Sequence, residues 1–167
     1  MQGSTSDSCT RHAKNKKSVE ITDMKITAGA WVVVYCPKKR SFLLGKRSGR
    51  VNNPKRWNLF GGRLDPGESP IHAALRELRE ESGIRATKNE LKKLKKRRIH
   101  CTSNRSRPRE LHFFLLTADK ELTPRLNKEH TNYGWFRAGS IPSTVNRPTD
   151  IALRNGLLAE CASIAIG

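Results

Sequence analysis

The sequence is poor in aromatic residues and in long apolar runs, and each shortage excludes a class of protein. Only 6% of its 167 residues are Phe, Trp or Tyr, and no RNP-like, zinc-finger or KH pattern occurs. A dedicated surface that stacks single-stranded bases is therefore not supported. No run is long enough to span a bilayer, and the N-terminus lacks the apolar region of a secretory signal. We expect an intracellular, cytoplasmic protein that does not associate with membranes.

Cysteine is also scarce, and its spacing argues against a structural zinc site. The four cysteines form no CxxC pair, and Cys36 and Cys161 lie in apolar runs where packed free thiols are expected. The histidines have no ligand spacing either, and we expect them at the surface or as filler. The chain has no internal repeat. A disordered basic tail is expected over residues 1–22, followed by one domain over residues 23–167.

Acidic residues are few, and their distribution is uneven. The chain has 33 Lys and Arg against 15 Asp and Glu, which gives a net charge of +18. Basic residues outnumber acidic ones 13 to 3 over residues 1–61 and 11 to 2 over residues 85–110, but the balance reverses, 3 to 5, over residues 62–84. An acidic stretch between basic ones suits a polyanionic substrate, which the positive field would attract. A run such as Lys92–Arg98 is equally well explained as a solvated face or as an RNA contact.

The acidic stretch, Gly62–Ile84, reads GRLDPGESPIHAALRELREESGI and has the local signals of a turn followed by a helix. Asp-Pro-Gly at 65–67 is a turn signal. Ser69 followed by Pro70 is typical of a helix N-cap with proline at the first helical position. Gly83 suits the residue just beyond the helix end. The pattern predicts a helix of roughly three to four turns.

This helix presents an apolar stripe and an acidic face. The stripe consists of Ile71, Ala74, Leu75 and Leu78. Glu77, Glu80 and Glu81 stand at i, i+3 and i+4, so their side chains share one face and repel one another. A bound divalent cation would turn this repulsion into an advantage, because Mg²⁺ takes carboxylate oxygens as ligands together with substrate phosphates. Glu68, before the helix, is expected to pair with Arg76.

The stretch resembles the Nudix box of the Nudix hydrolase superfamily, whose MutT-like members share this spacing. The fixed positions are Gly62, Glu68, Arg76, Glu77, Leu78, Glu80, Glu81, Gly83 and Ile84. The resemblance extends from about residue 28 to residue 142. It implies an α+β fold, an αβα sandwich with a mixed central sheet between helices. It also implies metal-dependent attack of water on the pyrophosphate of a nucleoside diphosphate linked to another group.

The resemblance also implies roles for individual residues. Glu77 and Glu81 would be ligands of Mg²⁺, with Mn²⁺ as a substitute, and Glu80 would be a further ligand or a positioning residue. The backbone carbonyl of Gly61 would be another ligand, although Phe60 stands where the family commonly has proline. The box does not fix the general base, and Glu77, Glu80 and Glu129 all remain candidates.

Other segments predict phosphate contacts and the remaining secondary structure. The basic residues before the Gly-Gly pair, which are expected to include at least one phosphate ligand, are Arg47, Arg50, Lys55 and Arg56. The predicted strands are Ala28–Cys36, Ser41–Lys46, Trp57–Phe60, Leu94–Cys101, Leu111–Ala118 and Tyr133–Phe136, with a closing amphipathic helix over Thr149–Ile164. Strands with a helix in the middle and one at the end predict a mixed sheet between helices.

Three functions compete. The first is a pyrophosphohydrolase that acts on a nucleotide or polyphosphate small molecule: a nucleoside triphosphate, a nucleotide sugar or a dinucleoside polyphosphate. The second is an RNA 5′-end pyrophosphohydrolase or decapping enzyme that uses the basic segments as an RNA contact. The third is a non-catalytic nucleotide-binding regulator, which ranks last because every box glutamate is present. Neither the substrate nor the oligomeric state can be predicted from the sequence.

Overall fold

The computed structural model describes residues 27–94, 97–99 and 109–166. The strands are Thr27–Cys36 (β1), Ser41–Arg47 (β2), Trp57–Asn58 (β3), Phe60–Arg63 (β4), Leu91–Lys93 (β5), Arg97–Ile99 (β6), Arg109–Thr117 (β7) and His130–Arg137 (β8). The helices are Pro70–Ser82 (α1), Arg147–Arg154 (α2), Leu157–Ile166 (α3) and the 3₁₀ turn Ala138–Ser140 (η1). The tail expected over residues 1–22 lies outside the described residues.

The strands of the described ranges form one mixed sheet with the order β3-β2-β1-β7-β5. Strands β1 and β7 are parallel along their length, and the other pairs are antiparallel. One edge of β1 is shared, because Gly29–Val32 pair with β4 and Val34–Cys36 pair with β2. This split places the Gly61-Gly62 pair against Ala30 and Trp31 in the middle of the sheet.

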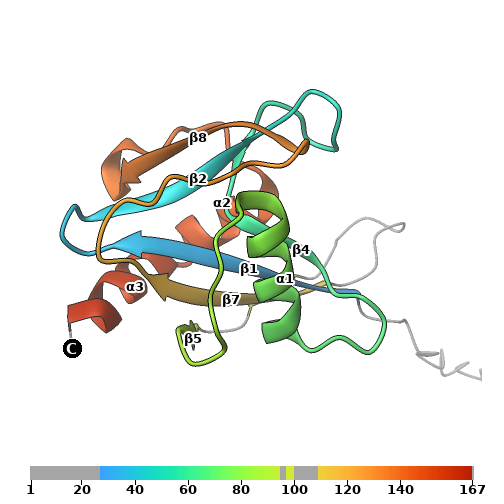
Figure 1. The fold of residues 1–167 in the computed structure, drawn as a ribbon, viewed down its shortest axis with the longest axis horizontal. Helices are drawn as coiled ribbons and strands as arrows, with labels where there is room; N and C mark the ends of the chain where they lie inside the picture. Colours follow the sequence, from blue (N-terminus) through green and yellow to red (C-terminus); the bar gives the residue numbers. More distant parts are fainter. Residues whose placement is uncertain (1–26, 95–96, 100–108, 167) are drawn as a thin grey trace, which may run out of the picture.

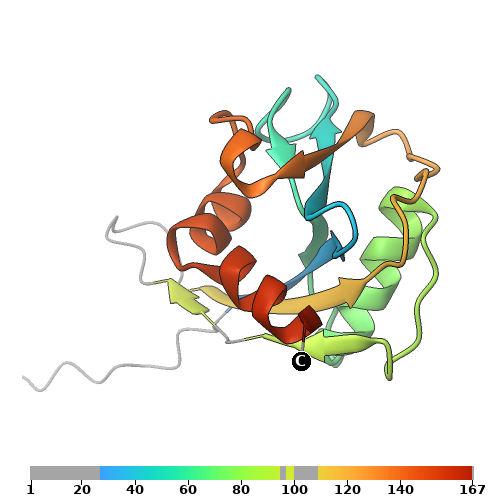
Figure 2. The same ribbon diagram turned by 90° about the vertical axis from the view of Figure 1, so that its left-hand side faces the viewer.

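Helices cover both faces of this sheet, which confirms the predicted mixed sheet between helices (Figures 1 and 2). Alternate residues of β1 enter two separate cores. Trp31, Val33 and Tyr35 pack with residues of α2 and α3, whereas Val32 and Val34 pack with residues of α1. Every residue from 30 to 36 is therefore buried, as expected for a strand covered on both faces.

The boundaries of several predicted elements are wrong. The single closing helix expected over Thr149–Ile164 is two helices, because Gly156 takes a left-handed φ of 70° and ends the first one. The strand expected over Trp57–Phe60 is interrupted at Leu59. The strand expected over Leu94–Cys101 is replaced by β5 and β6, which are both antiparallel to β7, and its end lies outside the described residues.

Two expectations from composition can be compared with the described part of the chain. Cys36 and Cys161 are buried and free, as predicted. None of the helices in the described ranges is long and apolar enough to cross a membrane.

Candidate active site

The acidic helix α1 begins and ends where its capping residues predict. The Ser69 hydroxyl accepts a hydrogen bond from the His72 N–H, Pro70 occupies the first turn, and Gly83 takes a left-handed φ of 69°. The apolar stripe contributes Ala74 and Leu78 to the core beneath α1. Helix α1 packs on β4 and β1, so its glutamates lie beside the Gly61-Gly62 pair.

Glu81 is a buried carboxylate held by the backbone of β4. Its side chain is only 3% exposed, and its Oε2 accepts a 2.7 Å hydrogen bond from the Gly61 N–H. Burial raises the pKa of Glu81 to about 8; the Gly61 N–H and Arg47 oppose this rise, and Glu77 and Glu129 add to it. A carboxyl group with this pKa is protonated at neutral pH until a cation arrives.

The close packing of β4 against β1 and against α1 depends on two glycines. Gly61 has a φ of 148°, a conformation that side chains rarely adopt, and a Cβ there would collide with the backbone of Ala30 and Trp31. A Cβ on Gly62 would collide with the Glu77 carboxylate, which shows how closely that side chain lies over β4. Burial also raises the pKa of Glu77, while the hydrogen bond from Arg76 lowers it.

Arg76 links the acidic residues on the outer side of the cluster. Its Nε and Nη2 each donate a 2.9 Å hydrogen bond to Glu68, which gives the expected pairing in bidentate form. Its Nη1 donates to Glu77 Oε1 at 2.9 Å and lies 3.5 Å from Glu80 Oε2. The hydrogen bonds from Arg76 lower the pKa of Glu68 to about 2. Glu80, with 49% of its side chain exposed, is the most accessible of the α1 glutamates.

These residues fit a divalent metal ion by their chemistry. They offer hard oxygen donors that repel one another, and burial, together with the neighbouring carboxylates, raises the pKa values of Glu77 and Glu81. No three His, Cys, Asp or Glu side chains within the described ranges stand as a ready-made metal cage. Mg²⁺ does not need one, because it usually keeps several waters and binds a few carboxylates together with substrate phosphates.

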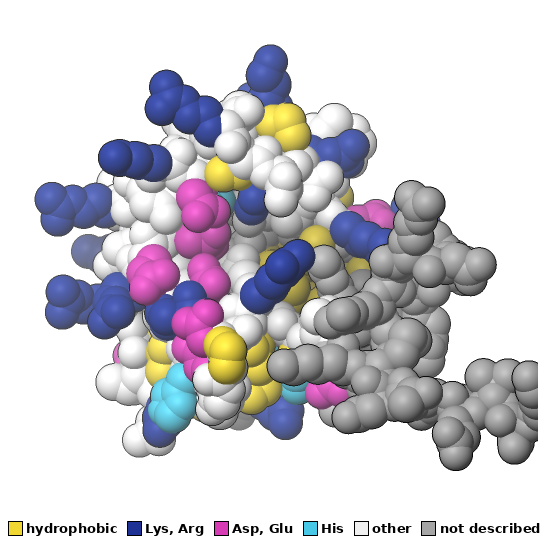
Figure 3. All heavy atoms as spheres, turned by 90° about the vertical axis from the view of Figure 1, so that its right-hand side faces the viewer, with side chains coloured by type: hydrophobic (Ala, Val, Ile, Leu, Met, Phe, Trp, Pro, Cys, Tyr) yellow, Lys and Arg dark blue, Asp and Glu magenta, His cyan; other side chains and the backbone are white. Residues whose placement is uncertain are grey.

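Glu129 lies across from α1, just before β8. Its side chain is exposed, and its negative charge raises the pKa of both Glu77 and Glu81. The backbone fixes its position, because its carbonyl accepts a 2.7 Å hydrogen bond from the Ser48 N–H and its N–H donates to Asn127 Oδ1 at 2.9 Å. The structure therefore brings this candidate base to the acidic cluster. Figure 3 shows Asp and Glu side chains gathered in one column with Lys and Arg beside them.

His130, expected at the surface or as filler, is a buried residue that supports this side of the site. It is 5% exposed, lies 3.1 Å from Asn58 Oδ1 and packs edge-on against the Phe60 ring at 5.3 Å. Burial, and then the charge of Arg47, lower its pKa to about 4, so it is neutral at physiological pH. Nothing in its spacing along the sequence distinguishes it, because its partners are brought to it by β3 and β4.

The basic residues predicted to bind phosphate are distributed over different places. The charge of Arg47 lowers the pKa of both Glu81 and His130, and its Nε donates a hydrogen bond to the Asn52 carbonyl at 2.9 Å. Arg56 instead donates to the Val145 carbonyl at 3.1 Å and lines a separate recess with Arg147 and Arg154. Arg50 and Lys55 are exposed, and neither makes an ion pair with a residue in the described ranges.

Arg47 also lines a recess whose residues the sequence did not identify as part of a site. This hollow of about 160 Å³ lies beside the Gly-Gly pair, and its polar lining includes the amides of Asn52, Asn53 and Asn146. No periodicity or motif in the sequence marks these asparagines. Their proximity to Gly61-Gly62 becomes apparent only when β4 pairs with β1 and the loop before β3 folds over it.

Comparison with known proteins matches this arrangement to one family. The model of the NUDIX domain matches residues 25–155. The chain belongs to that family. A crystal structure of a MutT NUDIX hydrolase from Burkholderia pseudomallei superimposes with a TM-score of 0.64 and 26% identity, covering 78% of this chain and 97% of that one. A Caenorhabditis elegans Ap4A hydrolase in a binary complex has the same fold, with a TM-score of 0.59, 22% identity, and coverage of 84% and 98%.

Two curated relatives match shorter stretches of the NUDIX domain. The asymmetrical bis(5′-nucleosyl)-tetraphosphatase of Mus musculus is 33% identical over 96 residues, which is 57% of this chain and 63% of that protein. The CTP pyrophosphohydrolase of Escherichia coli is 44% identical over 48 residues, 29% of this chain and 36% of that protein. Each match spans less than two thirds of the relative's length.

Proposed function

We propose that this NUDIX chain is a Mg²⁺-dependent pyrophosphohydrolase of nucleotide substrates. The observation that carries the proposal is the buried Glu81 carboxylate, anchored by the Gly61 N–H and surrounded by the charges of Glu77 and Glu129. A structural ion pair would place a cationic side chain on Glu81, which makes no ion pair with a residue in the described ranges. Arg76 instead stands at the outer side of the cluster, where it holds Glu68, Glu77 and Glu80.

Each residue in this site has a distinct task. Glu77, Glu81 and the Gly61 carbonyl would hold the metal, with Glu80 as a further ligand. When bound, Mg²⁺ neutralises charge that develops on the phosphates and makes a water more acidic. Arg47 binds a phosphate oxygen at the edge of the cluster. Glu129, fixed by Ser48 and Asn127, accepts the proton of the attacking water; Glu77 and Glu80 are the other candidates for this base.

The proposed reaction is the hydrolysis of a phosphoanhydride bond. The water oxygen forms a bond to phosphorus, the bond from phosphorus to the bridging oxygen breaks, and the bridging oxygen leaves with the second phosphate. The water's proton passes to the carboxylate base. The products are a nucleoside monophosphate and the remaining phosphate-bearing part.

We propose small nucleotides, and dinucleoside polyphosphates first among them, as the substrate class. The names of the mouse tetraphosphatase and the E. coli CTP pyrophosphohydrolase support this choice, since both describe enzymes of small nucleotides. RNA with a 5′-triphosphate or cap is the second candidate. It is favoured by the net charge of +18 and by the exposed Lys92 and Lys93 on β5.

A hydrolysis screen tests the proposal. The full chain is incubated with dinucleoside tetraphosphate, nucleoside triphosphates, a nucleotide sugar and 5′-triphosphate RNA, with Mg²⁺, with Mn²⁺ and with EDTA. We expect turnover of at least one small nucleotide that needs the metal and stops on its removal. Equal rates with metal and with EDTA, or no turnover of any substrate, would contradict the proposal, and turnover of RNA alone would favour the second candidate.

A further inference from the structure

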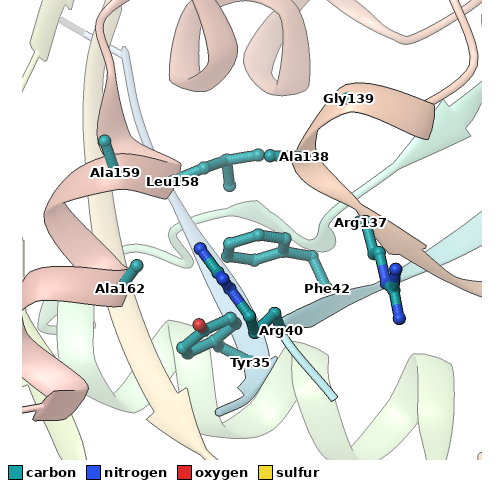
Figure 4. Close-up of a pocket in the computed structure, with 9 residues that line it drawn as sticks. All are labelled: Tyr35, Arg40, Phe42, Arg137, Ala138, Gly139, Leu158, Ala159 and Ala162. Carbon is teal, nitrogen blue, oxygen red and sulfur yellow. The ribbon is translucent and has the colours of Figure 1, made fainter. Parts of the chain in front are cut away.

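A second cavity lies on the face of the sheet that α1 does not cover. It has a volume of about 570 Å³, which falls within the range of roughly 300–1,000 Å³ that is usual for small-molecule sites. Strands β1 and β2 contribute Tyr35 and Phe42, and helix α3 contributes Leu158 and Ala162 (Figure 4). Arg40, from the turn between β1 and β2, and Arg137, at the end of β8, complete the lining on the solvent side.

The polar groups of this cavity have no partner within the described ranges. Tyr35 is only 3% exposed as a residue, but its hydroxyl is not one of the fully buried polar atoms, and it makes no hydrogen bond to a described residue. The guanidinium groups of Arg40 and Arg137 likewise make no ion pair or hydrogen bond there. None of the residues that line the cavity is acidic, so these donors are available to a ligand. The cavity therefore combines an apolar interior with unused hydrogen-bond donors.

The rest of the lining is apolar and belongs largely to the core. The Tyr35 and Phe42 rings stack with their centroids 4.6 Å apart, and both side chains are 3% exposed. Leu158 is 8% exposed and belongs to the same core. Small side chains of α3, including Ala162, leave the space above these residues open (Figure 4). A flat or slender apolar group would replace water here without disturbing the core.

The backbone of Arg40 adds a separate observation. Arg40 has a φ of 53°, the left-handed region in which a residue with a Cβ is disfavoured, and its N–H closes the tight turn on the Pro37 carbonyl at 3.1 Å. Glycine would take this conformation at no steric cost. The turn instead carries an arginine, and its side chain lines the cavity. Strained residues of this kind gather at ligand sites.

We infer that this cavity binds an organic acid with an apolar body, as a ligand separate from the nucleotide substrate. The carboxylate or phosphate of the ligand accepts hydrogen bonds from Arg40 and Arg137, and the apolar part lies against Phe42 and α3. The Tyr35 hydroxyl donates to an acceptor atom on the ligand. Tyr35, Phe42 and Leu158 belong to the core covered by α2 and α3, whereas the glutamates stand on the helix that covers the other face. The two sites are therefore independent.

Calorimetric titration of the full chain, without divalent metal, tests this inference. Naphthoate and decanoate serve as probes with the same head group and different bodies, so their relative affinity distinguishes a flat aromatic ligand from an alkyl one. We expect at least one acid to bind, and its neutral amide to bind on the order of tenfold more weakly. The double variant Arg40→Gln/Arg137→Gln should lose affinity by a similar factor.

Two further variants identify the place of binding. Ala162→Trp fills the cavity and should abolish binding, and Tyr35→Phe, which removes only the hydroxyl, should weaken it by several fold. The matched control is Lys38→Gln/Lys39→Gln, which also removes two positive charges, both of them from the turn that carries Arg40 but outside the cavity lining. Binding that this control weakens as much as Arg40→Gln/Arg137→Gln would reflect general attraction of anions and would overturn the inference. Failure of both acids to bind the unmodified chain would overturn it too.

Discussion

At the scale of single residues, the NUDIX site depends on a carboxylate placed where water cannot solvate it. Glu81 is nearly fully buried, and one backbone N–H stabilises its charge while two neighbouring glutamates oppose it. Such an arrangement favours the protonated carboxyl at neutral pH, because buried charge without a counter-ion is unfavourable.

Gly61→Ala should destabilise the fold by on the order of 2–3 kcal/mol, because the methyl group collides with the β1 backbone at a φ that disfavours any side chain. Urea unfolding monitored by circular dichroism measures this change. Gly49→Ala is the control, since nothing lies within 4 Å of a Cβ there, and it should change the free energy of unfolding by about 0.5 kcal/mol or less. Equal effects of the two variants would show that Gly61 is not sterically required.

His130 should make the stability of the chain depend on pH. Its folded pKa of about 4 lies below the unfolded value near 6.5, so the unfolded state binds more protons between these values and stability falls as pH decreases through this window. Between pH 7 and pH 5 the loss due to His130 alone is on the order of 2 kcal/mol.

The matched comparison isolates this effect from the titration of the carboxyl groups. Urea unfolding at pH 7 and pH 5 is measured for the unmodified chain, for His130→Gln and for His72→Gln, which changes an exposed histidine. The pH-dependent loss should shrink in His130→Gln and persist in His72→Gln. The same loss in all three proteins would contradict the burial of a neutral His130.

At the scale of elements, residues close together in the sequence predict the ends of helices and the contacts between neighbouring side chains. Ser69, Pro70 and Gly83 determine the ends of α1, and the pairing of Glu68 with Arg76 follows from their positions around one turn and one helix. The break between α2 and α3 was missed, because Asn-Gly at 155–156 lies within an otherwise continuous amphipathic pattern. The burial of Glu81 could not be predicted, because it depends on β4, which pairs with a strand about thirty residues earlier in the chain.

The basic segment from Lys92 to Arg98 provides a test at this scale. It overlaps β5 and β6, which both pair with β7, and the side chains of Lys92 and Lys93 are exposed. Reversing Lys92, Lys93, Lys95 and Lys96 to Glu should leave small-nucleotide turnover within a few fold, because the glutamate cluster and Arg47 are unchanged. If the segment binds RNA, the variant should bind a short RNA more weakly and with a shallower dependence on log salt, since the slope is roughly −0.7 per phosphate for single strands.

A salt titration by fluorescence anisotropy measures this slope for both proteins. We expect weak binding of RNA by the unmodified chain, because small nucleotides are the proposed substrates. Tight binding that discriminates among RNA structures and is lost on charge reversal would contradict that expectation and favour the RNA-processing candidate.

At the scale of the whole molecule, the sheet and its two cores separate the acidic candidate active site from the apolar cavity. The face covered by α1 carries the acidic column (Figure 3), whereas the face covered by α2 and α3 carries the apolar cavity (Figure 4). Lys and Arg side chains lie beside the acidic column (Figure 3), and the net charge of the chain, +18, would attract a polyphosphate. Composition predicted this charge contrast, but only the fold reveals that Arg47 approaches the carboxylates while Arg56 lines another recess.

The most direct test of the account is turnover by Glu81→Gln on the best substrate of the screen in saturating Mg²⁺. Glutamine preserves the shape of the side chain and an oxygen for the Gly61 N–H but removes the charge. We predict a loss of rate on the order of 10²–10³ with an unchanged far-ultraviolet spectrum, whereas Asp119→Asn, on an exposed residue, should retain full activity. A folded Glu81→Gln protein that turns over its substrate at the unmodified rate would contradict the assignment of this cluster as the metal centre.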